Sequence, residues 1–125
     1  MKKINFDKLS VVIVVHQAIP VGPSYDLKNF FIKHKINELL FITHPLIYLK
    51  EFYVDSSSYF LYKNGDKVAS KIAFHWVMPD LFLYIKDFLY SITWVCLQRK
   101  KFSIFIGADP LNAFAGLFLK KIGKV

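Results

Sequence analysis

Three apolar runs of strand length stand out along the chain. Residues 10–17 (SVVIVVHQ) form a continuous stretch of mostly β-branched side chains without polar alternation. This pattern is typical of a strand that is buried on both faces of a parallel sheet. Residues 37–44 (NELLFITH) and 102–107 (FSIFIG) have the same character. We therefore expect three buried strands, of which 10–17 is the first and central one.

Apolar residues recur at helical spacing in the segments between and after these runs. Residues 25–35 are expected to form a helix that Ser24 can cap. Residues 111–122 are expected to form another, because Asp109-Pro110 before them combines a capping side chain with a first-turn proline.

The longest predicted helix spans residues 80–98. It carries a polar stripe and a wide apolar side, and the apolar side is expected to pack into the core. The polar stripe comprises Asp80, Tyr84, Asp87, Ser91 and Gln98, and the apolar side comprises Leu81, Ile85, Phe88, Leu89, Ile92, Val95 and Cys96.

Residues 59–72 (YFLYKNGDKVASKI) contain Asn64-Gly65 between two strand-prone runs. This pair is a strong signal for a type I′ hairpin, which we expect to be exposed and basic at a sheet edge. The element order then predicts one α/β, Rossmann-like domain over residues 1–125, with a mostly parallel sheet, flanking helices and one β-hairpin. A parallel sheet whose last element is a helix leaves strand edges uncovered, so we expect the domain to continue past Val125 in a larger protein.

Composition excludes a disordered chain and points to an anionic partner. Hydrophobic residues make up 54% and aromatic residues 18% of the sequence, with a mean hydropathy of +0.34. The surplus apolar surface needs a membrane, a partner chain or a further part of the same protein to cover it. A net charge of +8 suits lipid headgroups, nucleotide phosphates or nucleic acid, and charge alone does not choose among them. Nucleic acid is the least favoured of the three, because the basic residues gather on no recognition helix.

The chain is expected to be cytoplasmic. Its single cysteine, Cys96, lies in an apolar run and gives no intrachain disulfide, and residues 1–15 lack a signal-peptide pattern. The most membrane-like stretch, 81–97, carries Lys86 and Asp87 at its centre, so we expect no transmembrane span.

Ligands of open α/β sheets gather at the carboxyl ends of the strands, which here are the segments after residues 17, 44 and 107. Gly22 and Pro23, with Ser24, can bring backbone amides near a phosphate, or they can form a plain turn, since no G-x-G-x-x-G or Walker sequence is present. Asp109 can orient a sugar hydroxyl while capping a helix, and Asn112 can share its pocket.

Histidines offer a second set of candidates. His16 and His44 fall at strand ends on the expected ligand side, and His75 follows the hairpin. Each can act as a base or as a hydrogen-bond donor to a phosphate, or can be a structural histidine. Because no two histidines have an i, i+4 spacing, we expect no metal site, and we expect no cofactor.

Three segments carry a family resemblance: FSIFIGADPLNAFAGLFLKK, FLYKNGDKV and VVIVVHQAIPVGPSYDL. Together they resemble the N-terminal domain of family 4-like glycosyltransferases with the GT-B fold. The resemblance covers nearly the whole chain. It implies an incomplete N-terminal domain of an enzyme that transfers a sugar from a nucleotide-sugar donor to a glycan or lipid-linked acceptor.

The resemblance also implies roles for the candidate residues. Gly22 and Pro23 match the loop that approaches the donor phosphates, while residues 109–112 match the loop that lines the acceptor. Many members have a histidine or a glutamate-proline pair where this chain has Ala108-Asp109-Pro110. The donor is held largely by a C-terminal domain that this chain lacks, so the chain alone is expected to be inactive.

Two interpretations of function therefore stand. The resemblance implies a glycosyltransferase at the inner membrane face, with residues 80–101 as the candidate membrane surface. The alternative is a small, basic membrane-surface module without catalysis, which would use the hairpin and the same helix.

Overall fold

A computed structural model describes residues 3–16, 21–46, 56–74 and 78–125. The elements in chain order are a 3₁₀ turn (Phe6–Lys8), β1 (Ser10–His16), α1 (Pro23–Lys33), β2 (Glu38–His44), β3 (Ser58–Lys63), β4 (Asp66–Ile72), α2 (Asp80–Leu97), β5 (Ile104–Gly107) and α3 (Pro110–Lys121). This order confirms the predicted α/β class, and each predicted element is present within a few residues of its expected bounds.

The five described strands form one sheet in the order β4-β3-β2-β1-β5. β1 pairs in parallel with β2 and β5, whereas β3 pairs antiparallel with both β2 and β4. The sheet is therefore mixed, and the expectation of a mostly parallel sheet was wrong. Its cause is the hairpin, which joins the edge of β2 directly instead of returning through a crossover helix. β1 is an interior strand as predicted, but β2 holds the central position.

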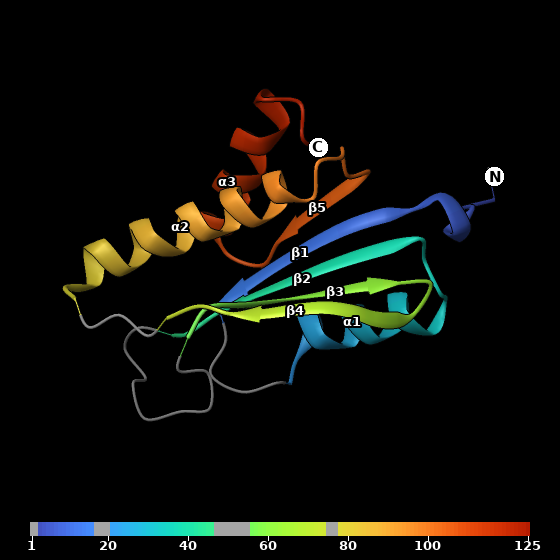
Figure 1. Cartoon of the computed structure of the whole chain (residues 1–125), viewed down its shortest axis with the longest axis horizontal. Coiled ribbons are helices and arrows are strands. Elements are labelled where there is room, and N and C mark those ends of the chain that lie inside the picture. Colours follow the sequence, from blue (N-terminus) through green and yellow to red (C-terminus); the bar gives the residue numbers. More distant parts are fainter. Residues whose placement is uncertain (1–2, 17–20, 47–55, 75–77) are drawn as a thin grey trace.

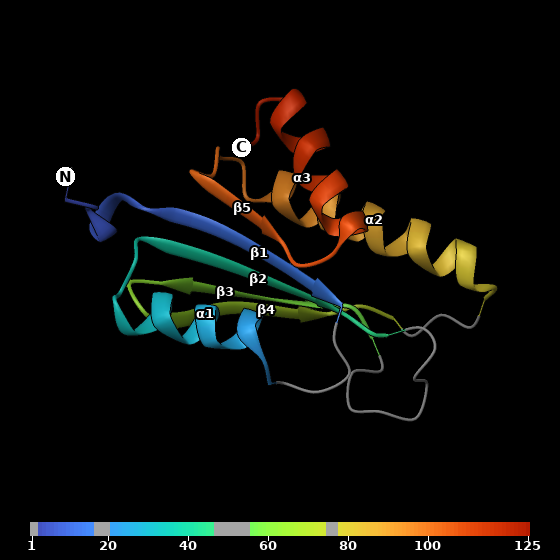
Figure 2. The same ribbon diagram turned by 180° about the vertical axis from the view of Figure 1, so that it is seen from behind.

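The sheet is covered on both faces. α1 lies on one face, and α2 and α3 lie together on the other (Figures 1 and 2). Successive side chains of β1 point to opposite faces of the sheet. Val12 and Val14 pack towards α2 and α3, while Val11 and Ile13 pack towards α1. This double coverage explains why β1 is apolar at successive positions.

The inward face of α2 differs from the prediction, although Val95 of the predicted apolar side is buried as expected. Asp87 of the polar stripe is only 1% exposed and Ser91 is fully buried, whereas Leu81 is 67% and Leu89 is 56% exposed. The inner face is completed by Trp94 and Val95, which pack into the core. The polar residues lie inside because buried polar side chains of the sheet form hydrogen bonds with them.

The turns show two outcomes. Asn64 (φ 52°) and Gly65 (φ 86°) both have positive φ, which confirms the predicted type I′ hairpin at the β4 edge. Ser24, however, does not cap α1. This helix begins at Pro23, its N-cap is Gly22 with φ 109°, and no side chain bonds the cap. A proline at the first helical position has no N–H to satisfy, so the helix can begin one residue before Ser24.

Candidate functional site

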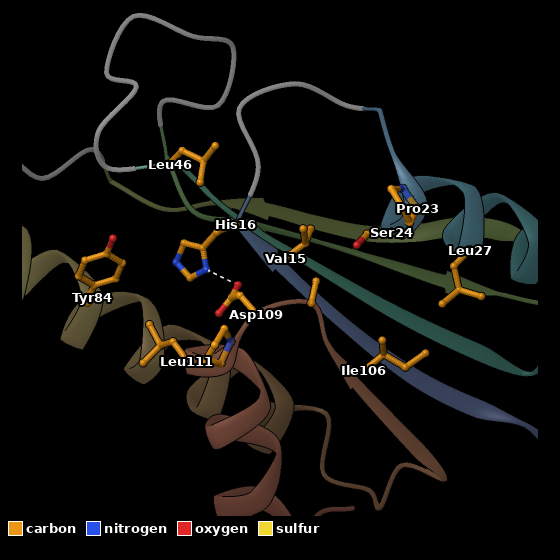
Figure 3. Close-up of a pocket in the computed structure, with 12 residues that line it drawn as sticks. Val15, His16, Pro23, Ser24, Leu27, Leu46, Tyr84, Ile106, Asp109 and Leu111 are labelled. Atoms are coloured by element: carbon orange, nitrogen blue, oxygen red, sulfur yellow. Dashed lines mark hydrogen bonds and ion pairs between the residues drawn. The ribbon is translucent and has the colours of Figure 1, made fainter.

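A cleft of about 770 Å³ opens at the carboxyl ends of β1 and β5. Its walls include His16 from the end of β1, Pro23 and Leu27 from α1, Tyr84 from α2, and Asp109 from the turn between β5 and α3, as Figure 3 shows. The cleft therefore lies where the topology of an open α/β sheet places ligands.

His16 is held between two carboxylates in this cleft. Its Nδ1 lies 3.0 Å from Asp109 Oδ2, and its Nε2 lies 2.9 Å from Asp87 Oδ2. Asp87 is buried, whereas the Asp109 side chain is 29% exposed. One side of the ring therefore faces the protein interior, and the other faces the open cleft.

The charge of His16 follows from this placement. Burial alone would lower the pKa of His16, but the hydrogen bonds to Asp109 and Asp87, together with their charges, raise it to about 9. Burial likewise raises the pKa of each aspartate, and the bond to His16 outweighs it, so both carboxyl pKa values are lowered. At neutral pH the group is an imidazolium that donates from both nitrogens to two carboxylates.

α3 sets the position of Asp109. The Asp109 side chain caps α3 by accepting from the Asn112 backbone N–H at 3.0 Å, as the sequence predicted. The Asn112 side chain donates from Nδ2 to Asp109 Oδ2, and within the described part of the chain its buried Oδ1 accepts no hydrogen bond. Gly107 lets the helix approach this closely, since a Cβ there would lie 2.4 Å from the Ala113 backbone nitrogen.

A second histidine lies behind the first. Parallel pairing places His44 on β2 beside His16 on β1, with ring centroids 4.8 Å apart. His44 Nδ1 lies 2.8 Å from Ser57 Oγ, His44 Nε2 lies 2.7 Å from Ser91 Oγ, and Ser57 donates to Asp87 Oδ1 at 3.0 Å. Burial lowers the pKa of His44 to about 3, so this ring is neutral.

The structure places the predicted site residues in three groups. His16, Asp109 and Pro23 line the cleft. Asn112 and His44 are buried behind it: Asn112 hydrogen-bonds Asp109, and His44 is connected to His16 through Ser57 and Asp87. Gly22 caps α1 beside the cleft without lining it. His75 lies outside the described residues.

Three buried residues of the cluster were not predicted: Asp87, Ser57 and Ser91. The signal for two of them was present, because Asp87 and Ser91 stand four residues apart on the same side of a mostly apolar helix. Ser57 precedes its strand in a polar segment, and no spacing in the sequence links it to the others.

The cluster suits proton transfer to or from a bound hydroxyl. Histidine with one nitrogen fixed by a buried carboxylate and the other facing a ligand is the arrangement of a general base. In the described residues no group of three or more His, Cys, Asp or Glu side chains is arranged to hold a metal ion, and none of their helices is long and apolar enough to cross a membrane.

Comparisons with protein-family models, with curated proteins and with solved structures found no match.

Proposed function

We propose that this chain is the acceptor-side, N-terminal part of a glycosyltransferase with the GT-B fold, and that His16 is the general base for the acceptor hydroxyl. The observation that carries this proposal is the Asp87–His16–Asp109 arrangement at the mouth of the cleft. Sugar transfer requires that an acceptor hydroxyl is oriented and loses its proton as the new bond forms. The three side chains can orient the hydroxyl and accept its proton.

The proton path follows from the hydrogen bonds. A sugar hydroxyl that replaces Asp109 at His16 Nδ1 removes one of the interactions that raise the pKa of His16. The pKa then moves towards neutrality, so the ring releases its Nδ1 proton to solvent. The neutral ring can then take the hydroxyl proton while Asp87 stabilises the imidazolium that forms again. The displaced Asp109 carboxylate accepts from a neighbouring hydroxyl of the same sugar.

The donor would approach from the α1 side. The positive end of the α1 dipole at Gly22 and Pro23 faces the region beside His16, and it favours a diphosphate group there. The donor nucleotide would be held mainly by a C-terminal domain, and the enzyme would work in the cytoplasm on a glycan or lipid-linked acceptor.

A transfer assay tests this proposal. A protein that extends past Val125 is incubated with a panel of nucleotide-sugars and acceptors, and binding and transfer are both measured. His16→Gln should lower transfer by about 10²-fold to 10⁴-fold, the range of general acid–base catalysis. His34→Gln is the matched control, because His34 is an exposed histidine at the end of α1. Absence of both nucleotide-sugar binding and transfer, or equal activity of the two variants, would contradict the proposal.

A second candidate function, binding to an anionic membrane surface, is favoured by the outward side of α2 and α3. Phe88 of α2 contacts Phe114 and Phe118 of α3, with ring centroids 5.8 and 6.0 Å apart, so the exposed apolar residues of the two helices form one continuous surface. Lys121 follows Phe114 and Phe118 at helical spacing on the same side of α3. Apolar contact and positive charge together suit an anionic bilayer.

Vesicle flotation tests this candidate. Wild-type protein should float with phosphatidylglycerol vesicles at low salt, and less at high salt or with phosphatidylcholine alone. Leu89→Glu should abolish flotation. Ile72→Glu should not, because Ile72 is a 72% exposed residue of the edge strand β4, away from α2 and α3. Salt-insensitive behaviour, or equal loss in both variants, argues against a membrane surface on α2 and α3.

A further inference from the structure

The hydrogen bonds behind His16 have only one consistent arrangement of protons. Asp87 is a carboxylate and can only accept, so the single hydroxyl proton of Ser57 is donated to Asp87 Oδ1. The Ser57 oxygen must then accept from His44 Nδ1, 2.8 Å away.

This assignment determines the tautomer of His44. A neutral imidazole carries one N–H, and here that proton is at Nδ1, so Nε2 has a lone pair. Ser91 Oγ, 2.7 Å from Nε2, therefore donates its hydroxyl proton to His44. The chain of donors runs in one direction, from Ser91 through His44 and Ser57 to Asp87.

This chain of hydrogen bonds also fixes the orientation of the Asp87 carboxylate. Its Oδ1 accepts from Ser57 and lies 3.1 Å from Lys86 Nζ, while its Oδ2 accepts from His16 Nε2 at 2.9 Å. Both oxygens are thus occupied by partners from three different segments. A carboxylate held in this way fixes the plane of the imidazole that donates to it.

We propose that His44, as the Nδ1–H tautomer, is a positioning residue that acts through Ser57 on Asp87 and so directs His16 Nδ1 into the cleft. His44 itself is fully buried and does not line the cleft. The inference rests on the proposed function only for its effect on catalysis; the orientation of His16 can be measured without a substrate.

The first measurement uses the wild-type chain. Long-range ¹H–¹⁵N NMR correlations of the histidine side chains at pH 7 report the tautomer of each ring. His44 should show a protonated Nδ1 and an unprotonated Nε2, and His16 should be protonated at both nitrogens. A His44 ring protonated at Nε2, alone or in addition, overturns the proposal without any variant having to fold.

The second measurement compares two neighbouring buried serines. Ser57→Ala removes the hydrogen bond to Asp87, whereas Ser58→Ala removes the hydrogen bond between Ser58 and Thr43, at 2.8 Å. Ser57→Ala should move the titration midpoint of His16 down towards 6.5 and lower kcat by about 10-fold to 100-fold with little change in KM, as for outer-shell residues that orient a catalytic group. Ser57→Thr, which keeps the hydroxyl, should restore both properties.

The outcomes separate this inference from the proposed function. If Ser57→Ala leaves the His16 midpoint where Ser58→Ala leaves it, His44 and Ser57 do not position His16, whatever the enzyme does. If the tautomer and the shift are as expected but no variant and no wild-type protein transfers a sugar, the positioning of His16 stands and the proposed reaction falls.

Discussion

Raising the pH from 6.5 to 9 should destabilise this fold through a single residue, His16. Its pKa is 6.5 when unperturbed and about 9 in the folded chain, so the native state keeps a proton that the unfolded state releases. The stabilisation is complete below pH 6.5 and is lost as the pH rises through 9. One bound proton corresponds to about 1.4 kcal/mol per pH unit, which gives a loss of about 3 kcal/mol over this window.

Urea denaturation at intervals between pH 6 and pH 9.5 measures this loss, with the fluorescence of buried Trp94 as one probe. Asp109→Asn should flatten the profile, because asparagine can still cap α3 but no longer supplies the charge beside His16. His34→Gln should keep the wild-type slope. An unfolding free energy that stays level or rises between pH 6.5 and 9 would refute the assigned environment of His16.

Two further predictions concern the supports of the cluster. Gly107→Ala places a Cβ 2.4 Å from the Ala113 backbone nitrogen, so α3 must move away from β5; we expect a loss of about 1–3 kcal/mol in urea denaturation and a lower His16 titration midpoint by NMR. Ser91→Ala leaves the Nε2 of buried His44 without its donor and should cost about 1–3 kcal/mol, whereas an unchanged denaturation midpoint would mean that the bond is not formed.

The fold was predictable from the sequence as far as local signals reach. The β-branched run of β1 favours a strand buried inside a sheet, and Asn64-Gly65 adopts the positive φ values that a two-residue hairpin needs. Periodicity also located α2, but it could not say which side faces inward. A polar stripe faces solvent by default, and it faces the core only when another segment supplies buried partners.

The site was predictable in part for the same reason. His16 and His44 ended adjacent strands, and parallel pairing in register brought them together. Asp109 was predictable as a helix cap. The bond from His16 to Asp87 spans 71 residues and depends on how α2 crosses the sheet, so no local pattern could reveal it.

The hairpin turn has a consequence for how this sheet tolerates change. The Asn64 N–H is directed at the Ile36 and Asn37 carbonyls, and a Cβ at Gly65 would lie 2.9 Å from the Ile32 carbonyl oxygen. The turn is therefore docked on the end of α1, at the opposite end of the strands from the cleft. Hairpin tips usually accept inserted residues, but an insertion here would detach the ribbon from α1. This tip is a fixed point, and a tag or fusion is better placed elsewhere on the surface.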